Sequence, residues 1–117
     1  MIRLLTNVMN NTIENTIEVR VKVTFRKIFI DYDNCAIYYL GYRLHLTKSE
    51  FSVLKVIIEN DPRTHTASDI SNLCERNITP KSVLFHVHNI NKKAFSIGKR
   101  VLISNKIKIG YFLNKEM

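Results

Sequence analysis

The spacing of hydrophobic residues changes once along this chain, and that change limits the folds it can adopt. From Ile17 to Phe25 every second residue is apolar, and the residues between them are charged or carry a hydroxyl. Such alternation is typical of a strand with one buried face. From Phe51 onward the apolar residues recur three or four positions apart, as on the buried face of a helix. The chain therefore begins as a sheet and continues as helices, which predicts the α+β class.

Short strands are expected to follow the first one before the helices begin. Asp31–Asn34 and Gly41 are turn-forming residues that separate apolar segments. The pattern predicts an antiparallel sheet that continues with strands over residues 27–30, 35–40 and 43–46. Residues 1–16 are rich in Asn and Thr and show no clear period, so we expect a loose N-terminal arm there.

The first two helices carry recognisable start and stop signals. Thr47–Glu50 fits a capping box, in which a hydroxyl and a carboxylate satisfy the first free backbone N–H groups of a helix. That helix is expected to end at Asn60–Pro62, because proline cannot continue it. A shorter helix is expected to begin after Thr66, with Ile70 and Leu73 facing inward.

A third helix and a closing hairpin complete the predicted order of elements. The helix covers residues 79–95, with Thr79 as its cap and Pro80 at the first helical position, where a missing N–H costs nothing. Residues 101–113 then alternate again and predict a β-hairpin that turns at Ser104–Lys106.

The excess of positive over negative charge lies in the last third of the chain. Residues 76–115 contain nine Lys and Arg and no Asp or Glu, so this segment carries +9, while the other 77 residues sum to −1 and give the net charge of +8. A surface that binds a polyanion requires such a concentration of one sign.

The helix at 79–95 contains three of these lysines and places two of them on the side opposite the core. At about 100° per residue, its core-facing stripe contains Val83, Val87, Ile90 and Ala94. The opposite face contains Lys81, Phe85, His88 and Lys92, with Ser82 and Asn89 beside them. An α-helix fits the major groove of B-DNA, where Asn and Lys can read base edges and an apolar group can meet a thymine methyl.

Metal binding and catalysis explain this segment less well. His86 and His88 are two residues apart and point to opposite sides of a helix, so they cannot share one ion. Cys35 and Cys74 lie far apart in the sequence, and we interpret both as buried thiols rather than as a disulfide or metal pair. The sequence has no Gly-rich phosphate loop and no nucleophile with a base at a known spacing. We therefore expect that the protein is not an enzyme and that it binds neither a metal nor a cofactor.

Four motifs occur in an order that is typical of one family. They are LTKSEFSVL at 46–54, ITPKSV at 78–83, VLFHVHNINKKA at 83–94 and GYFL at 110–113. In these motifs the chain resembles the winged helix-turn-helix DNA-binding domains of the OmpR/PhoB type, and is closest in style to the ToxR/CadC branch that lacks a receiver domain. It departs from them at Asn91, where the family commonly has Arg.

The resemblance implies a fold and an interface. We expect a winged-helix domain over residues 17–117, with helix 79–95 in the major groove and the wing, residues 101–113, on the adjacent minor groove or backbone. Ser82, Phe85, His88 and Asn89 are expected to contact bases. The expected contacts to phosphates and the minor groove are Lys81, Lys92, Lys93, Asn105, Lys106 and Lys108.

The resulting hypothesis is a bacterial transcription regulator that binds specific sequences of double-stranded DNA. RNA polymerase or a second regulator is a further candidate partner, as is a dimer formed on DNA. One alternative is a winged helix that binds proteins and has no DNA target of its own, and another is RNA binding. Because no apolar run is long enough for a membrane span, we expect a cytoplasmic protein, or the cytosolic part of a longer membrane-anchored regulator.

Overall fold

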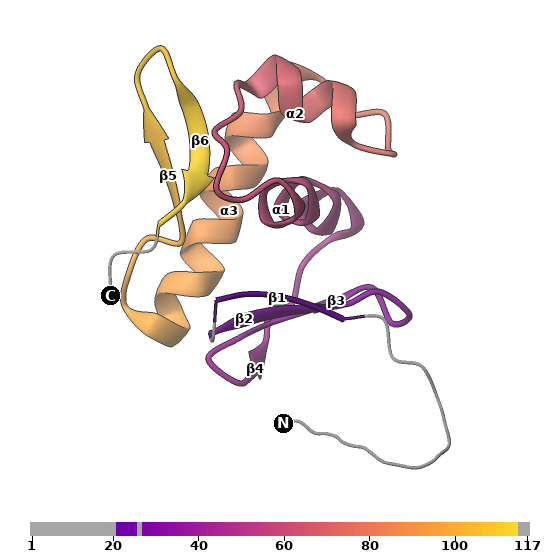
Figure 1. Cartoon of the computed structure of the whole chain (residues 1–117), viewed down its shortest axis with the longest axis vertical. Helices are drawn as coiled ribbons and strands as arrows, with labels where there is room; N and C mark the ends of the chain where they lie inside the picture. The colour runs from indigo at the N-terminus through magenta and orange to yellow at the C-terminus, as the bar shows by residue number, and fades with distance from the viewer. Residues whose placement is uncertain (1–20, 26, 115–117) are drawn as a thin grey trace.

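Two small antiparallel sheets lie against a group of three helices, the larger one below the helices and the hairpin at one side (Figure 1). The structure, a computed structural model, describes residues 21–25 and 27–114. The predicted arm at 1–16 and the start of the first strand, at 17–20, lie outside the described residues. The elements in chain order are β1 (Val21–Phe25), β2 (Ile28–Asp31), β3 (Ala36–Tyr39), β4 (Tyr42–Arg43), α1 (Lys48–Glu59), α2 (Ala67–Leu73), α3 (Pro80–Gly98), β5 (Ile103–Lys106) and β6 (Gly110–Leu113). This order confirms the predicted α+β winged-helix class.

The N-terminal sheet has the strand order β1-β2-β3-β4 and is antiparallel throughout. Its last strand is shorter than the predicted 43–46, because only Tyr42 and Arg43 pair with β3. The backbone N–H of Leu44 still donates to Ile37 O at 2.9 Å, and the chain then leaves the sheet toward α1. The sheet packs under α1 and α3 (Figure 1).

Local capping sets the starts of α1 and α2. The Thr47 hydroxyl accepts from the backbone N–H of Glu50 at 3.1 Å, and the Glu50 carboxylate accepts from the backbone N–H of Thr47 at 3.0 Å, which confirms the predicted capping box. Thr66 and Asp69 form the same reciprocal pair at the start of α2. Ile70 is buried as predicted. Leu73 was predicted to face inward, but it is the last residue of α2 and is half exposed.

Helix α3 runs through the centre of the domain and contacts both sheets and both other helices. It begins at Pro80 after the Thr79 cap, as predicted, and continues three residues beyond the predicted end to Gly98. A Cβ on Gly98 would lie 2.8 Å from the ring of the buried Tyr39, so only glycine allows the helix end to pack against β3. The predicted core-facing stripe is confirmed: the buried residues of α3 are Val83, Val87, Ile90 and Ala94.

The hairpin turns later than the sequence pattern predicts. Asn105 pairs with Tyr111 and Lys106 with Gly110, so the turn consists of residues 107–109 rather than Ser104–Lys106. Ile109 N donates to Lys106 O at 3.0 Å and closes the turn, with Lys108 at a φ of +68°. The alternating isoleucines of the turn resemble a strand in the sequence, but they lie at the exposed tip.

The two cysteines are free, and the prediction that both are buried is wrong. Cys74 is half-buried at the end of α2, whereas Cys35 is exposed in the turn between β2 and β3. Cys35 has a positive φ of 48° in that turn. None of the helices in the described part of the chain has the length and apolar character needed to cross a membrane.

Candidate nucleic-acid interface

The outer face of α3 is a continuous exposed surface. Lys81, Phe85, His88 and Lys92 follow one another at spacings of three and four, and all four are exposed. Phe85 keeps 61% of its surface in solvent. Ser82 and Asn89 lie half-buried along the same face, as the helical wheel predicts. The helix thus presents two cations, an aromatic ring and hydrogen-bonding side chains in one row.

The beginning of α3 adds backbone groups to this surface. The Thr79 hydroxyl accepts from Ser82 N at 3.2 Å, and the Ser82 hydroxyl donates to Thr79 O at 2.9 Å. The first turn contains no acidic side chain, so the positive end of the helix dipole is not offset locally. This end of α3 is therefore electrically suited to a phosphate group.

Lys93 is the one predicted contact that the fold directs inward. Its ammonium donates to the carboxylate of Glu50, which is 3% exposed at the start of α1. Burial alone would raise the pKa of Glu50, but the hydrogen bonds from Lys93 and Thr47 and the electrostatic interactions with Lys93 and His86 outweigh it, so the pKa lies below its ordinary value. Lys93 therefore joins α3 to α1.

Asn91 fixes the hairpin to the other flank of α3. Its side-chain oxygen accepts from Leu102 N at 3.1 Å and from Ile103 N at 2.8 Å, and its amide donates to Ile103 O at 3.0 Å. One amide side chain thus satisfies three backbone groups where β5 begins. In the sequence, Asn91 stands out only as a departure from the family pattern. Its place on the helical wheel, on the flank beside the core-facing stripe, is the one sequence signal that it bonds within the domain.

The second strand of the hairpin is attached to the loop before α2. Tyr111 N donates to His65 O at 2.7 Å, and His65 N donates to Tyr111 O at 3.1 Å. Next to this bridge, a Cβ on Gly110 would lie 2.3 Å from His65 O, and the φ of Gly110 is +125°. Only glycine permits so close an approach. The hairpin is therefore held on both of its strands.

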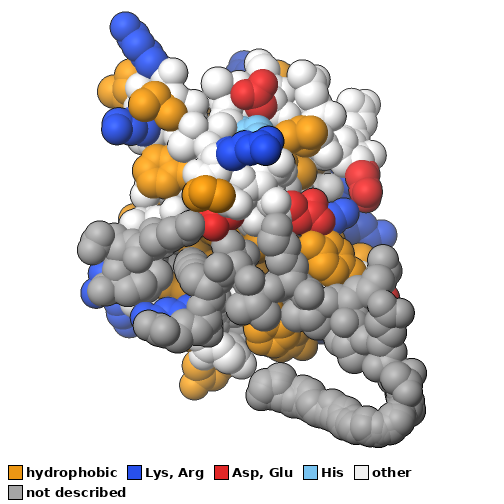
Figure 2. All heavy atoms as spheres, in the orientation of Figure 1, with side chains coloured by type: hydrophobic (Ala, Val, Ile, Leu, Met, Phe, Trp, Pro, Cys, Tyr) orange, Lys and Arg blue, Asp and Glu red, His pale blue; other side chains and the backbone are white. Residues whose placement is uncertain are grey.

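The predicted wing residues gather toward the far end of this hairpin. Asn105 and Lys106 are exposed at the end of β5, and Lys108 is exposed within the turn. Lys106 is thus the last strand residue, and Lys108 lies at the tip. Figure 2 shows Lys or Arg side chains beside hydrophobic ones at this end of the molecule. Strand β5 contacts α3, so the wing and the helix lie side by side.

No side chains in the described residues suggest a metal site. No group of three or more His, Cys, Asp or Glu among residues 21–25 and 27–114 could hold an ion. His88 is exposed on the outer face of α3, whereas His86 lies on its flank. The Nδ1 atom of His86 is buried and has no hydrogen-bond partner within the described structure.

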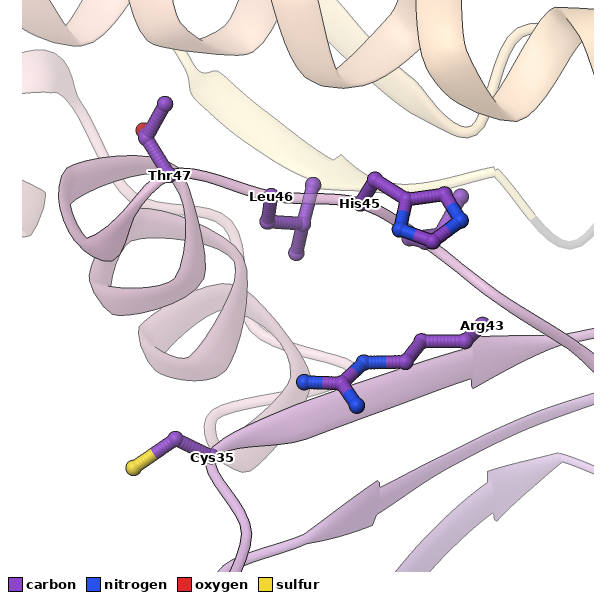
Figure 3. Close-up of a pocket in the computed structure, with 6 residues that line it drawn as sticks. Cys35, Arg43, His45, Leu46 and Thr47 are labelled. Atoms are coloured by element: carbon purple, nitrogen blue, oxygen red, sulfur yellow. The ribbon is translucent and has the colours of Figure 1, made fainter.

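A cavity of about 270 Å³ lies at the connection between the N-terminal sheet and α1 (Figure 3). In this view the guanidinium of Arg43 lies between the side chains of Cys35 and His45. Leu44, Leu46 and Thr47 complete the lining. None of the residues predicted to contact DNA belongs to this cavity.

Comparisons with known proteins identify the fold. No family model matches the chain. No curated protein matches it either. Among solved structures, the chain is similar to the DNA-binding domain of the response regulator AdeR in complex with an intercistronic region, with a TM-score of 0.65 and 24% identity over 77% of this chain and 95% of that one.

Two further solved structures agree with this. The chain is similar to DrrB, a Thermotoga maritima OmpR/PhoB homolog, with a TM-score of 0.62 and 25% identity over 77% of this chain, and it spans 42% of that response regulator. It is also similar to the DNA-binding domain of Escherichia coli CadC, with a TM-score of 0.65 and 16% identity over 83% of this chain and 92% of that one. The chain therefore has the winged-helix fold of the OmpR/PhoB-type DNA-binding domains.

Proposed function

We propose that this chain is a DNA-binding domain of a transcription regulator, in which α3 enters the major groove and the β5–β6 hairpin lies on the adjacent minor groove or backbone. The observation that carries the proposal is the outer face of α3, which is exposed, cationic and free of acidic side chains. The exposed side chains of this face contribute little to the packing of the domain, and the face complements a polyanionic groove.

The proposed contacts follow from the position of each side chain. Ser82, Phe85, His88 and Asn89 lie along the helix face and are proposed to contact base edges. The proposed contacts to phosphates and the minor groove are Lys81, Lys92, Asn105, Lys106 and Lys108. Lys93 is left out of this set because its ammonium is bonded to Glu50.

The similar solved structures support the same proposal. AdeR and CadC are described as DNA-binding domains, and the AdeR domain is bound to an intercistronic region. DNA binding by this chain rests on its own exposed surface together with that likeness of fold.

The salt dependence of binding tests the proposal. With about five phosphates neutralised, log K for a duplex should fall with log salt at a slope of roughly −4 to −5, since each contact contributes about −0.9. Fluorescence anisotropy of a labelled duplex between low and physiological salt measures the slope, and single-stranded RNA of equal length is the comparison. Affinity for duplex DNA that does not change with salt, or that is weaker than for the RNA, would contradict DNA binding.

Base reading and backbone holding can be separated with two variants. Asn89→Ala should relax the preference at one base position by about 1–3 kcal/mol, whereas Lys106→Ala should weaken binding to all sequences alike. Binding-site selection with both variants gives the measurement. If the Asn89→Ala profile matches that of the wild type, Asn89 does not contribute to base reading.

A protein-binding winged helix remains the second candidate, favoured by the exposed Leu84 and Phe85. For the DNA-binding function we expect a monomer in free solution that pairs with a second copy on DNA, because one helix and one wing give little contact for a genomic search. Sedimentation of the protein alone, and with a duplex that carries two selected sites, distinguishes the DNA-binding function from the protein-binding candidate. A tight dimer without DNA that buries α3 would favour the protein-binding candidate.

A further inference from the structure

The tip of the β5–β6 hairpin carries an apolar side chain, Ile107, that is not buried in the core of the domain. Ile107 is 83% exposed, more than any other large hydrophobic side chain in the described residues, and Ile109 behind it is 44% exposed. Both lie in the three-residue turn closed by the bond from Ile109 N to Lys106 O. A turn at this position could be made of polar residues without any loss of packing.

Cations stand directly beside this side chain. Lys106 precedes Ile107 and Lys108 follows it, and both lysines are exposed. Between Arg76 and Lys115 the sequence has no acidic residue. The tip is therefore an apolar group between two positive charges, which complements a narrow apolar gap bordered by negative charge on both sides.

Both strands of the hairpin are attached to the rest of the domain. The Asn91 side chain binds β5 where the strand begins, and the bridge between His65 and Tyr111 binds β6 one residue after Gly110. Only the end of the hairpin extends beyond these attachments, at the end of the molecule where α3 begins (Figure 1). Because both strands are attached, we expect the tip to keep its position when it contacts a partner.

We propose that Ile107 is an apolar wedge which the wing inserts at a base step of the minor groove, so that binding bends the duplex. This inference rests on the proposed function, since it places α3 in the neighbouring major groove. The minor groove is about 6 Å wide and is lined on both sides by phosphates, which Lys106 and Lys108 can contact while the side chain between them enters. Apolar wedges of this kind unstack a step and kink the duplex by about 20–90°.

Bending and affinity are measured on the same duplex. A 30-bp duplex recovered by binding-site selection with the wild-type protein carries a donor and an acceptor dye at its two ends. Wild-type protein should raise energy transfer as the ends approach, and 2-aminopurine placed at one step under the wing should become brighter as that step unstacks. Ile107→Ala should lose most of both signals, and its affinity should fall by about tenfold because the buried apolar surface is lost.

Two matched variants control for general effects of substitution. Ile107→Leu keeps an apolar side chain of equal size and should retain the bend. Val101→Ala removes an exposed apolar group at the foot of the hairpin and should leave bending unchanged. Because Ile107 makes so little contact within the domain, its substitution should leave the fold intact, and an unchanged urea transition of Ile107→Ala verifies this.

The outcomes separate the wedge from DNA binding itself. If wild-type protein binds the duplex with high salt dependence but leaves energy transfer and 2-aminopurine unchanged, the proposed function stands and the wedge is overturned. If no duplex is bound, both are overturned. Sedimentation with vesicles of phosphatidylglycerol and phosphatidylcholine tests another use of the tip: loss of vesicle binding in Ile107→Ala, with DNA bending intact, would overturn the wedge in favour of a lipid surface.

Discussion

The side chains on the inner side of α3 are buried or bonded within the domain, whereas those on its outer side are exposed to solvent. On the inner side, Ile90 is fully buried, and on the two flanks Asn91 and Lys93 bond to β5 and to Glu50. On the outer side, Phe85 and Lys92 are exposed. The inner side of α3 thus stabilises the fold, whereas its outer side remains available to a binding partner.

This difference teaches that residues adjacent in sequence can serve separate purposes. A substitution on the inner side should change the free energy of unfolding, and one on the outer side should change binding alone. The following predictions test where the boundary between the two sides lies, beginning with the largest expected effect.

Ile90→Ala should destabilise the domain by about 3 kcal/mol, because it removes a fully buried side chain and leaves a cavity. Phe85→Ala removes a larger side chain, yet it should change stability by no more than about 0.5 kcal/mol, because that ring is exposed. Urea unfolding of both variants measures the difference. A loss of more than about 2 kcal/mol in Phe85→Ala would show that the outer side is part of the core.

The inner side could be predicted from the sequence because its signals are local. The helical spacing of Val83, Val87 and Ile90 fixed which side of α3 packs inward, and the caps at Thr47 and Thr79 fixed where helices begin. Such patterns depend on neighbours within one turn of helix. The core-facing stripe of α3 and both caps lie at the residues that the sequence predicts.

Asn91→Ala should destabilise the domain by about 2 kcal/mol, since three backbone groups at Leu102 and Ile103 lose their partner. Asn91→Asp is the informative companion, because it keeps the accepting oxygen and removes the amide donor, so its loss should be smaller. Urea unfolding gives both values, and Asn105→Ala on the exposed part of β5 is the control. Equal stability of Asn91→Ala and Asn105→Ala would exclude a structural role for Asn91.

Glu50→Gln should cost about 1–2 kcal/mol at pH 7, because it keeps an oxygen for the N–H of Thr47 but removes the charge that faces Lys93. The pKa of Glu50 is lowered in the folded protein, so the stabilisation by its charge is fully present above the unfolded pKa of about 4.3 and is lost as the pH falls through the folded pKa. The difference between wild type and variant should therefore be constant from pH 7 to pH 5 and shrink below that range.

Glu75→Gln is the matched control for this prediction. Glu75 pairs with Lys55 at 3.5 Å, but its side chain is 82% exposed, so its removal should cost less than about 0.5 kcal/mol. Urea unfolding at several pH values compares the two glutamates. A gap between wild type and Glu50→Gln that persists unchanged at pH 3 would mean that the charge of Glu50 is not what stabilises the fold.

Features that depend on distant residues could not be predicted in the same way. Lys93 lies on α3 and its partner Glu50 on α1, and nothing in the local pattern of either residue links them. The sequence pattern placed the turn at Ser104–Lys106 because Ile107 and Ile109 continue an alternating pattern, whereas in the structure Asn105 and Lys106 pair with Tyr111 and Gly110. Pairing across the fold decided both features, and local spacing does not contain that information.

Lys92 and Lys93 give the finest test of the boundary between the two sides, because they are neighbours of the same type. Lys92→Ala should leave stability unchanged and reduce the salt slope of duplex binding by about 0.9, the contribution of one phosphate contact. Lys93→Ala should leave the slope unchanged and lower stability, because buried Glu50 loses its counter-charge. Anisotropy titrations across a salt series and urea unfolding of the same two preparations give both quantities. A reduced slope in Lys93→Ala would mean that its ammonium leaves Glu50 for DNA, and the interface would then extend around the flank of α3 toward α1.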